Sequence, residues 1–155
     1  MRTDLPQTIY RKDYQPPSYL VDTVELGFDL DPTRTVVASR LSMRRNPDSR
    51  KRDIELSGGD MELVALRMNG KTLGRGDYSI SGAMLRIPNA PQEVVLEIET
   101  IVNPEKNTTL NGLYVSNGSF FTQCEAEGFR NITWFPDRPD VMARFTVMLR
   151  ADKAR

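Results

Sequence analysis

Apolar and polar residues alternate in Thr23-Val24-Glu25-Leu26-Gly27-Phe28-Asp29-Leu30, and this stretch decides the fold class of the chain. Because the side chains of a β-strand point alternately to its two faces, the pattern predicts a strand with one face buried. Asp31-Pro32 predicts a turn after it. Alternation resumes over residues 35–44, so we expect a second strand that pairs with the first as a hairpin. Its apolar face carries Val37, Leu41 and Met43.

The same pattern recurs in short pieces along the rest of the chain. Further strands are expected at 53–56, 61–68, 78–80, 85–87, 94–98 and 144–150. Asn69-Gly70 follows one of them and predicts a tight hairpin, because both residues tolerate a positive φ. Roughly eight short strands separated by turn signals favour an all-β fold, an antiparallel β-sandwich, over βαβ units. Helical structure is expected only as a short helix within 125–133 and a turn near 139–142.

Length and charge limit the functional classes. A chain of 155 residues is expected to form a single domain, residues 1–155. Lysine plus arginine and aspartate plus glutamate each number 21, so a balanced surface gives no reason to expect nucleic acid or an anionic membrane as partner. No apolar run approaches the roughly 20 residues of a membrane span, and the start lacks the apolar core of a secretion signal.

The counts of cysteine and histidine are equally informative. A single cysteine, Cys124, excludes an intrachain disulfide and fits a reducing compartment, so we expect a cytoplasmic protein. The chain contains no histidine. Catalytic zinc sites usually use at least one histidine, and serine or cysteine catalysis with an imidazole base requires one. Any chemistry must therefore run on carboxylates, lysine or tyrosine, or the catalytic residues must lie elsewhere.

Residues 110–145 are dense in aromatic and polar side chains. Five aromatic residues could line a pocket or belong to the core, and core is the favoured interpretation. Cys124 is interpreted as a small buried residue, because a neighbouring carboxylate disfavours its thiolate. The aromatic residues are Phe120, Phe121, Phe129, Trp134 and Phe135.

Glu125 and Glu127 are two carboxylates one residue apart. In an extended segment they would face the same side and could act together on a cation, whereas in a helical turn they would diverge. Arg130 could instead pair with one of them, and a salt-bridged surface is the commoner meaning of such a pair. The segment from Asp137 to Asp140 predicts a rigid, charge-paired turn.

The longest unusual segment carries a resemblance to a known family. Residues 123–133, Gln-Cys-Glu-Ala-Glu-Gly-Phe-Arg-Asn-Ile-Thr, and 137–142, Asp-Arg-Pro-Asp-Val-Met, strongly resemble the N-terminal domain of the aminopeptidase N family. The opening Tyr10-Arg11-Lys12-Asp13-Tyr14-Gln15-Pro16-Pro17 is similar as well, as are Leu113-Tyr114 and Arg144-Phe145-Thr146. The resemblance covers essentially the whole chain and is strongest to the bacterial cytosolic alanyl aminopeptidases.

The resemblance implies a zinc exopeptidase that removes the N-terminal residue of peptides. Its zinc motif, H-E-x-x-H with a distant glutamate, belongs to a later thermolysin-like domain and is absent here, as is the Gly-x-Met-Glu-Asn motif. By resemblance, Gln123 and Glu125 project into the substrate cleft. Glu125 would bind the free α-ammonium and Gln123 would line the pocket for the first side chain. Glu127 matches without an assigned role, and no catalytic residue or metal ligand is expected in this chain.

The resemblance also implies partners. The chain would pack on the catalytic domain of the same polypeptide, and the sandwich would continue beyond Arg155, leaving an unpaired edge that favours self-association of the fragment alone. Two alternatives remain open: a stand-alone β-sandwich that binds a peptide amine or a protein without catalysis, and a purely structural domain whose two glutamates form salt bridges.

Overall fold

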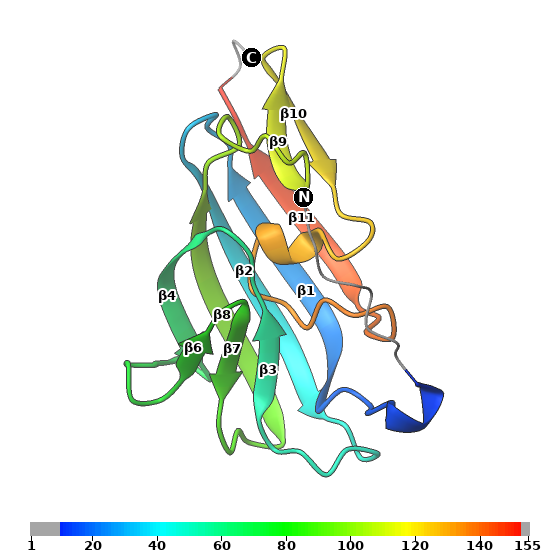
Figure 1. Cartoon of the computed structure of the whole chain (residues 1–155). Helices are drawn as coiled ribbons and strands as arrows, with labels where there is room; N and C mark the ends of the chain where they lie inside the picture. Colours follow the sequence, from blue (N-terminus) through cyan, green and yellow to red (C-terminus); the bar gives the residue numbers. More distant parts are fainter. Residues whose placement is uncertain (1–9, 153–155) are drawn as a thin grey trace.

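Five of the predicted strands, at 23–30, 35–44, 61–68, 94–98 and 144–150, belong to a six-stranded sheet, which is the larger layer of the sandwich (Figure 1). The structure is a computed structural model that describes residues 10–152. The predicted hairpin is present: β1 (Tyr19–Asp29) and β2 (Thr35–Arg45) are antiparallel, with Leu26 opposite Ser39. The sheet order is β11-β1-β2-β8-β4-β5, completed by β8 (Glu93–Val102), β4 (Glu62–Met68), β5 (Lys71–Thr72) and β11 (Arg144–Arg150).

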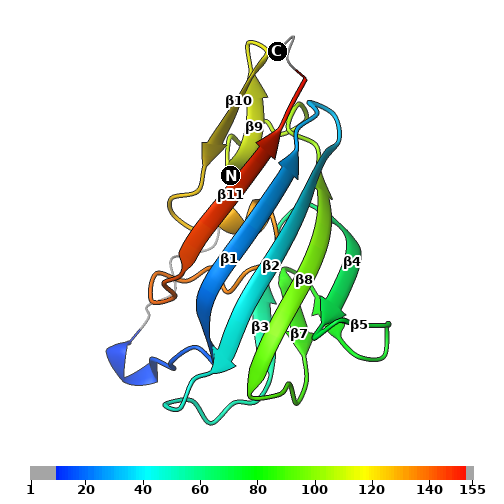
Figure 2. The ribbon, with the colours of Figure 1, turned by 180° about the vertical axis from the view of Figure 1, so that it is seen from behind.

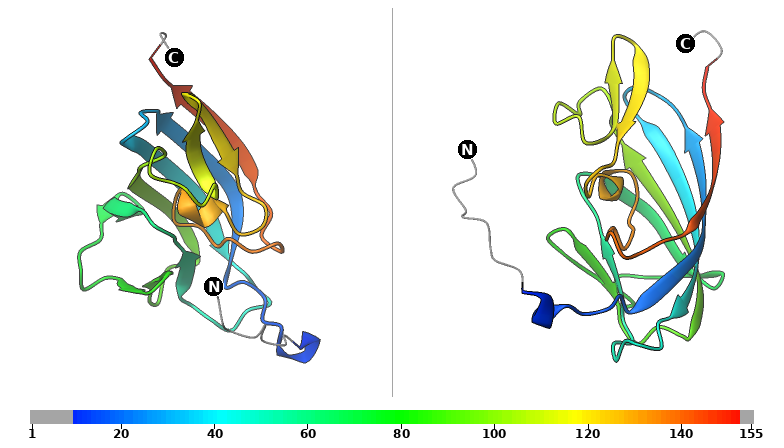
Figure 3. Two further views of the ribbon diagram at one scale, coloured as in Figure 1. Left: turned by 45° about the horizontal axis from the view of Figure 1, so that its top comes forward. Right: turned by 90° about the vertical axis from the view of Figure 1, so that its right-hand side faces the viewer.

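The second layer lies over one face of this sheet (Figure 3). It comprises the three-stranded sheet β3-β7-β6 and the hairpin of β9 and β10, with the 3-10 helix η2 between them in space. Seen from behind, no described element lies over the other face of the large sheet (Figure 2). The bounds are β3 (Ile54–Ser57), β6 (Ser79–Ser81), β7 (Met84–Ile87), β9 (Gly112–Ser116), β10 (Ser119–Gln123), η2 (Phe129–Asn131) and a first 3-10 helix η1 (Arg11–Asp13).

The core lies between the two layers, and the strand pattern explains why. Val24, Val37, Leu41 and Leu96, from β1, β2 and β8, are all fully buried. Burial of such side chains stabilises the fold by about 1.5–3 kcal/mol each. On the opposite face the charges alternate across four strands, in the register Glu25, Arg40, Glu97, Arg67. One face therefore excludes water and the other is solvated, which is the division that the alternation predicts.

Several predictions need correction. The described residues contain eleven strands rather than roughly eight. The hairpin of β9 and β10 was not predicted, although Asn117 and Gly118 at its turn have φ of 50° and 77°, as an Asn-Gly turn requires. The helical prediction for 125–133 reduces to three residues of 3-10 helix, Phe129–Asn131, and a turn is present at 139–140.

Strand β11 differs from the rest of the sheet in two ways. It pairs with β1 in parallel, with Val147 opposite Leu26, whereas the other pairs of the sheet are antiparallel. It is also one of the two edge strands of this sheet, and all seven of its residues are exposed. None of the described residues belongs to a helix long and apolar enough to cross a membrane.

Candidate functional site

The candidate site lies where β10 ends and the chain turns toward η2. Gln123, the last residue of β10, pairs with Gly112 of β9. The turn that follows closes when the amide of Gly128 donates to the carbonyl of Cys124 at 2.8 Å. A Cβ at position 128 would lie 2.5 Å from the carbonyl oxygen of Gln123 and 2.7 Å from the Cα of Cys124. Glycine is therefore required at 128, because the backbone folds back on itself there.

Buried hydrogen bonds attach the segment after this turn to the large sheet. Thr100 Oγ1 donates to the carbonyl of Ile132 at 2.9 Å, and the hydroxyls of Ser39 and Thr133 lie 2.9 Å apart. The backbone of Phe135 also exchanges two hydrogen bonds with Ser57 of β3, at 2.8 and 3.1 Å. Since buried polar groups are costly without partners, these bonds fix the position of the segment relative to both layers.

Of the five aromatic residues in 110–145, two belong to the core and three line a groove. Trp134 and Phe135 are 4% and 5% exposed, so they belong to the core as favoured. Phe120, Phe121 and Phe129 line an apolar groove of about 530 Å³ between the β9–β10 hairpin and β11. Its other walls are Leu26, Phe28, Leu30, Leu113, Thr122, Cys124, Ile132, Phe145, Val147 and Leu149.

The structure brings Gln123 and Glu125 together on the exposed side of the turn. Both residues are exposed, and Gln123 Nε2 donates to the backbone carbonyl of Glu125 at 2.7 Å. The Glu125–Ala126 peptide bond is cis. The carboxylate of Glu125 makes no ion pair within residues 10–152. This free carboxylate beside an amide can accept hydrogen bonds from a cationic amine.

Glu127 has a different environment, although it lies in the same turn. Its Oε1 is 3.2 Å from an Nη2 of Arg130. The alternative in which Arg130 pairs with one of the two glutamates is therefore confirmed, and the partner is Glu127. Glu127 has a φ of 65° and the segment is neither extended nor helical. Neither of the two geometries considered for the pair of glutamates is present.

Arg130 is also bound to Asp137, a pair that was not predicted from the sequence. Asp137 Oδ2 accepts from the backbone amide and the Nε of Arg130, each at 3.1 Å, and its carbonyl accepts from Nη2 at 2.7 Å. The side chains are only 24% and 15% exposed. A seven-residue spacing across an irregular segment carries no periodic signal, so the sequence could not show this pair.

The predicted charge-paired turn is formed mainly by Arg138 and Asp140, whose Nη2 and Oδ2 lie 2.6 Å apart. The hydrogen bond from Arg138 and, to a smaller degree, that from Tyr14 hold the pKa of Asp140 below its usual value. The Tyr14 hydroxyl donates to this carboxylate at 2.8 Å, and the hydrogen bond raises the pKa of Tyr14. The turn is thereby attached to the N-terminal segment.

Cys124 is a free thiol that is only half-buried, rather than buried as predicted. Burial, followed by the charge of Asp137, raises the pKa of its thiol. The thiol is therefore held in its protonated form at neutral pH, which is unsuited to nucleophilic attack.

No group of three or more histidine, cysteine, aspartate or glutamate side chains within the described residues could hold a metal ion.

The fold places the chain among domains of solved aminopeptidases and zinc metallopeptidases. The Legionella pneumophila aminopeptidase A superposes with a TM-score of 0.82 at 33% identity, over 89% of this chain and 16% of that one. An M1 zinc metallopeptidase from Deinococcus radiodurans superposes with a TM-score of 0.71 over 90% of this chain and 34% of that one, and at 16% identity it shows the fold alone.

Within that class, the chain fits the N-terminal domain of aminopeptidase N. It is 45% identical to aminopeptidase N of Caulobacter vibrioides over 152 residues, which are 98% of this chain and 18% of the relative. It is 41% identical to aminopeptidase N of Escherichia coli over 99% of this chain and 17% of the relative. No protein-family model matches. The chain thus spans less than a fifth of the length of these relatives, and nearly all of its own residues are in the match.

Proposed function

We propose that this chain is the substrate-recognition domain of a zinc aminopeptidase that releases N-terminal residues from peptides in the cytoplasm. The main observation that supports this proposal is the exposed turn of Gln123 and Glu125, in a chain 45% identical to aminopeptidase N of Caulobacter vibrioides over 98% of its length. Glu125 binds the α-ammonium of the substrate, and Gln123 lines the pocket for the first side chain. A zinc ion would be held by the catalytic part of the polypeptide, where it would supply activation of the attacking water.

The free carboxylate of Glu125 supports this role on physical grounds. An exopeptidase must bind a charged amine and reject an interior peptide bond. A carboxylate without an ion-pair partner forms a charge-assisted hydrogen bond with an ammonium, worth about 1.5–3 kcal/mol. When the cleft is closed around a substrate that lacks the amine, the same carboxylate is desolvated and unpaired, which penalises interior segments.

The apolar groove beside β11 supports a packing role. Phe145, Val147 and Leu149 are 50%, 52% and 64% exposed and line the groove from the sheet edge. Exposed apolar surface next to an unpaired strand edge is typical of an interface. In the proposed enzyme this surface faces the remainder of the polypeptide that carries the catalytic domain, and in the isolated chain it mediates self-association.

A chimera tests the function. Residues 1–155 replace the matching segment of the Caulobacter vibrioides aminopeptidase N, and kcat/KM is measured on alanine p-nitroanilide. Glu125→Ala is expected to lower kcat/KM about 30- to 1000-fold, corresponding to about 2–4 kcal/mol of transition-state binding. Glu127→Ala is the matched control, because it removes a carboxylate of the same turn that is already paired with Arg130.

The outcomes separate the proposed role from its alternatives. A Glu125→Ala chimera within threefold of the unchanged chimera sinks the amine-binding role. Zinc-independent hydrolysis by the isolated 155-residue chain overturns the assignment of catalysis to another domain. A chain that binds peptide amines tightly but supports no hydrolysis in the chimera favours the stand-alone binding module.

A further inference from the structure

The two carboxylates of the site turn are treated unequally by the rest of the structure. Glu127 is ion-paired with Arg130 at 3.2 Å, whereas Glu125 has no ion pair within the described residues. Two equivalent free carboxylates one residue apart would offer an amine two places to bind. Because Glu127 is ion-paired, only the carboxylate of Glu125 remains free to accept hydrogen bonds from an amine. The contacts of Glu127 therefore determine which carboxylate the turn presents.

We propose that Arg130 is a positioning residue: anchored by Asp137, it also forms an ion pair with Glu127 and fixes the turn so that Glu125 alone is presented to the amine. The inference rests on the proposed function of Glu125. Arg130 does not contact the substrate in this proposal: it acts through Glu127 and through the backbone of the turn.

The anchoring of Arg130 is strong enough for this role. Its guanidinium and amide make three hydrogen bonds with Asp137, at 3.1, 3.1 and 2.7 Å. Its carbonyl accepts from the amide of Gly59 at 2.7 Å, in the loop after β3. Because the side chains of Arg130 and Asp137 are mostly buried, water screens this pair less than an exposed ion pair.

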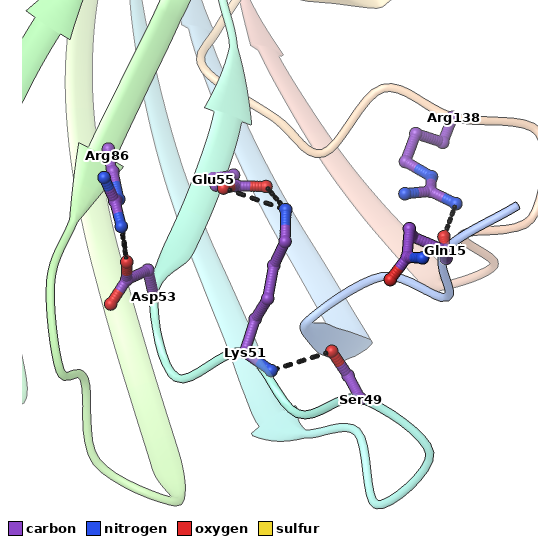
Figure 4. A network of polar contacts seen from close by, with 7 residues as sticks. All are labelled: Gln15, Ser49, Lys51, Asp53, Glu55, Arg86 and Arg138. Carbon is purple, nitrogen blue, oxygen red and sulfur yellow. Dashed lines mark hydrogen bonds and ion pairs between the residues drawn. The ribbon is translucent and has the colours of Figure 1, made fainter. Parts of the chain in front are cut away.

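The anchor continues into the N-terminal segment. Arg138, next to Asp137, donates to the carbonyl of Gln15 at 2.8 Å (Figure 4). Asp140 accepts from Tyr14, so the segment before β1 is attached to the same turn by two side chains. Residues 14–15 are thus hydrogen-bonded to Arg138 and Asp140, which are linked to the pair of Arg130 and Asp137 only through the chain.

Kinetics of the chimera described above test the proposal. Arg130→Met removes the charge but keeps much of the side-chain volume, and Arg138→Met is the matched control, because Arg138 belongs to the same anchor without an ion pair to Glu127. Arg130→Met is expected to lower kcat/KM about tenfold, mainly through KM. Adding Glu127→Gln removes the unpaired carboxylate and is expected to recover at least threefold of that loss. Arg130→Lys, which keeps the charge, should retain more activity than Arg130→Met.

Three results overturn the proposal. The first is a kcat/KM of the Arg130→Met chimera within twofold of the unchanged chimera, while Glu125→Ala lowers kcat/KM. In that case the proposed function of Glu125 still stands. The second is a loss confined to kcat that tracks the folded fraction, which indicates a merely structural role. The third is full activity of Glu125→Ala, which removes the proposed function itself.

A second measurement needs no catalysis and decides the case if the chimera is inactive. In the isolated chain, ¹H–¹⁵N spectra report the side-chain amide of Gln123 and the backbone amide of Gly128, whose hydrogen bonds define the turn. Arg130→Met is expected to shift both signals and to speed the hydrogen exchange of Gly128 at least fivefold, while Arg138→Met leaves them nearly unchanged. Unchanged signals in Arg130→Met overturn the proposal.

Discussion

Strands β2 and β11 carry the same alternation of apolar and polar residues but have opposite environments. In β2, Val37 and Leu41 are fully buried at the centre of the sheet. In β11, Val147 and Leu149 are more than half exposed at its edge. The difference shows that alternation determines which face of a strand is apolar, whereas burial depends on what covers that face. In β2 the second layer provides the cover, and along β11 the groove remains open.

The largest expected effect is on stability. Leu41→Ala should lower the free energy of unfolding by about 2–5 kcal/mol, because it leaves a cavity in a fully packed core. Leu149→Ala should cost less than about 1 kcal/mol, because the side chain is 64% exposed. Urea denaturation of the isolated chain at low concentration measures both. Equal losses would contradict the contrast between the two strands.

A second comparison concerns glycines in covered and open positions. Gly128→Ala should destabilise the chain by about 1–3 kcal/mol, because the added Cβ would press on the backbone of Gln123 and Cys124. Gly76→Ala meets no atom within 4 Å and is the control, expected within about 0.5 kcal/mol of the unchanged chain. Thermal unfolding measures both variants, and a Gly128→Ala variant as stable as the control would show that the turn relaxes freely.

The open groove should be visible as self-association. The isolated chain is expected to associate at rising concentration, and Val147→Lys should weaken association about tenfold, or about 1.4 kcal/mol, by placing a charge in the groove. Met148→Lys is the control, because Met148 is 57% exposed on the opposite face of the same strand. Sedimentation velocity measures the shift, and equal effects of the two variants would place the contact elsewhere.

The sequence predicted the parts of the fold whose signals are local. The hairpin of β1 and β2 follows from alternation, and the turn at Asn69-Gly70 is present with φ of 51° and 80°. The β9–β10 hairpin carried the same Asn-Gly signal, but its dense aromatic flanks favoured an interpretation as pocket or core. Parallel pairing of β11 with β1 joins residues more than a hundred positions apart, and no local pattern specifies it.

The site was predictable only in part, for a related reason. The family-like segment singled out Gln123 and Glu125, and the structure places them in one exposed turn. The ion pair of Arg130 with Asp137 depends on how an irregular segment folds across β3, so its partners could not be read from spacing. Periodic elements reveal their faces in the sequence, whereas irregular segments reveal their contacts only once the tertiary structure is known.

The smallest expected effect concerns an ion pair at the open surface of the second layer. Asp53 accepts from the amide of Asn89 at 2.9 Å and pairs with Arg86 (Figure 4). These hydrogen bonds lower the pKa of Asp53. A lowered folded pKa contributes stability that is present above the unfolded value, about 4, and is lost as the pH falls toward the folded value.

Acid titration of stability tests this contribution. Between pH 5 and pH 2.5, the free energy of unfolding should fall less steeply in Asp53→Asn than in the unchanged chain. The difference should not exceed about 1 kcal/mol, because Arg86 is 57% exposed and water screens the pair. Identical slopes would show that the carboxylate titrates alike in the folded and unfolded chains. A difference several times larger would show that the pair of Asp53 and Arg86 is shielded from water in solution. Its environment would then resemble that of the covered strand β2 rather than that of the open strand β11.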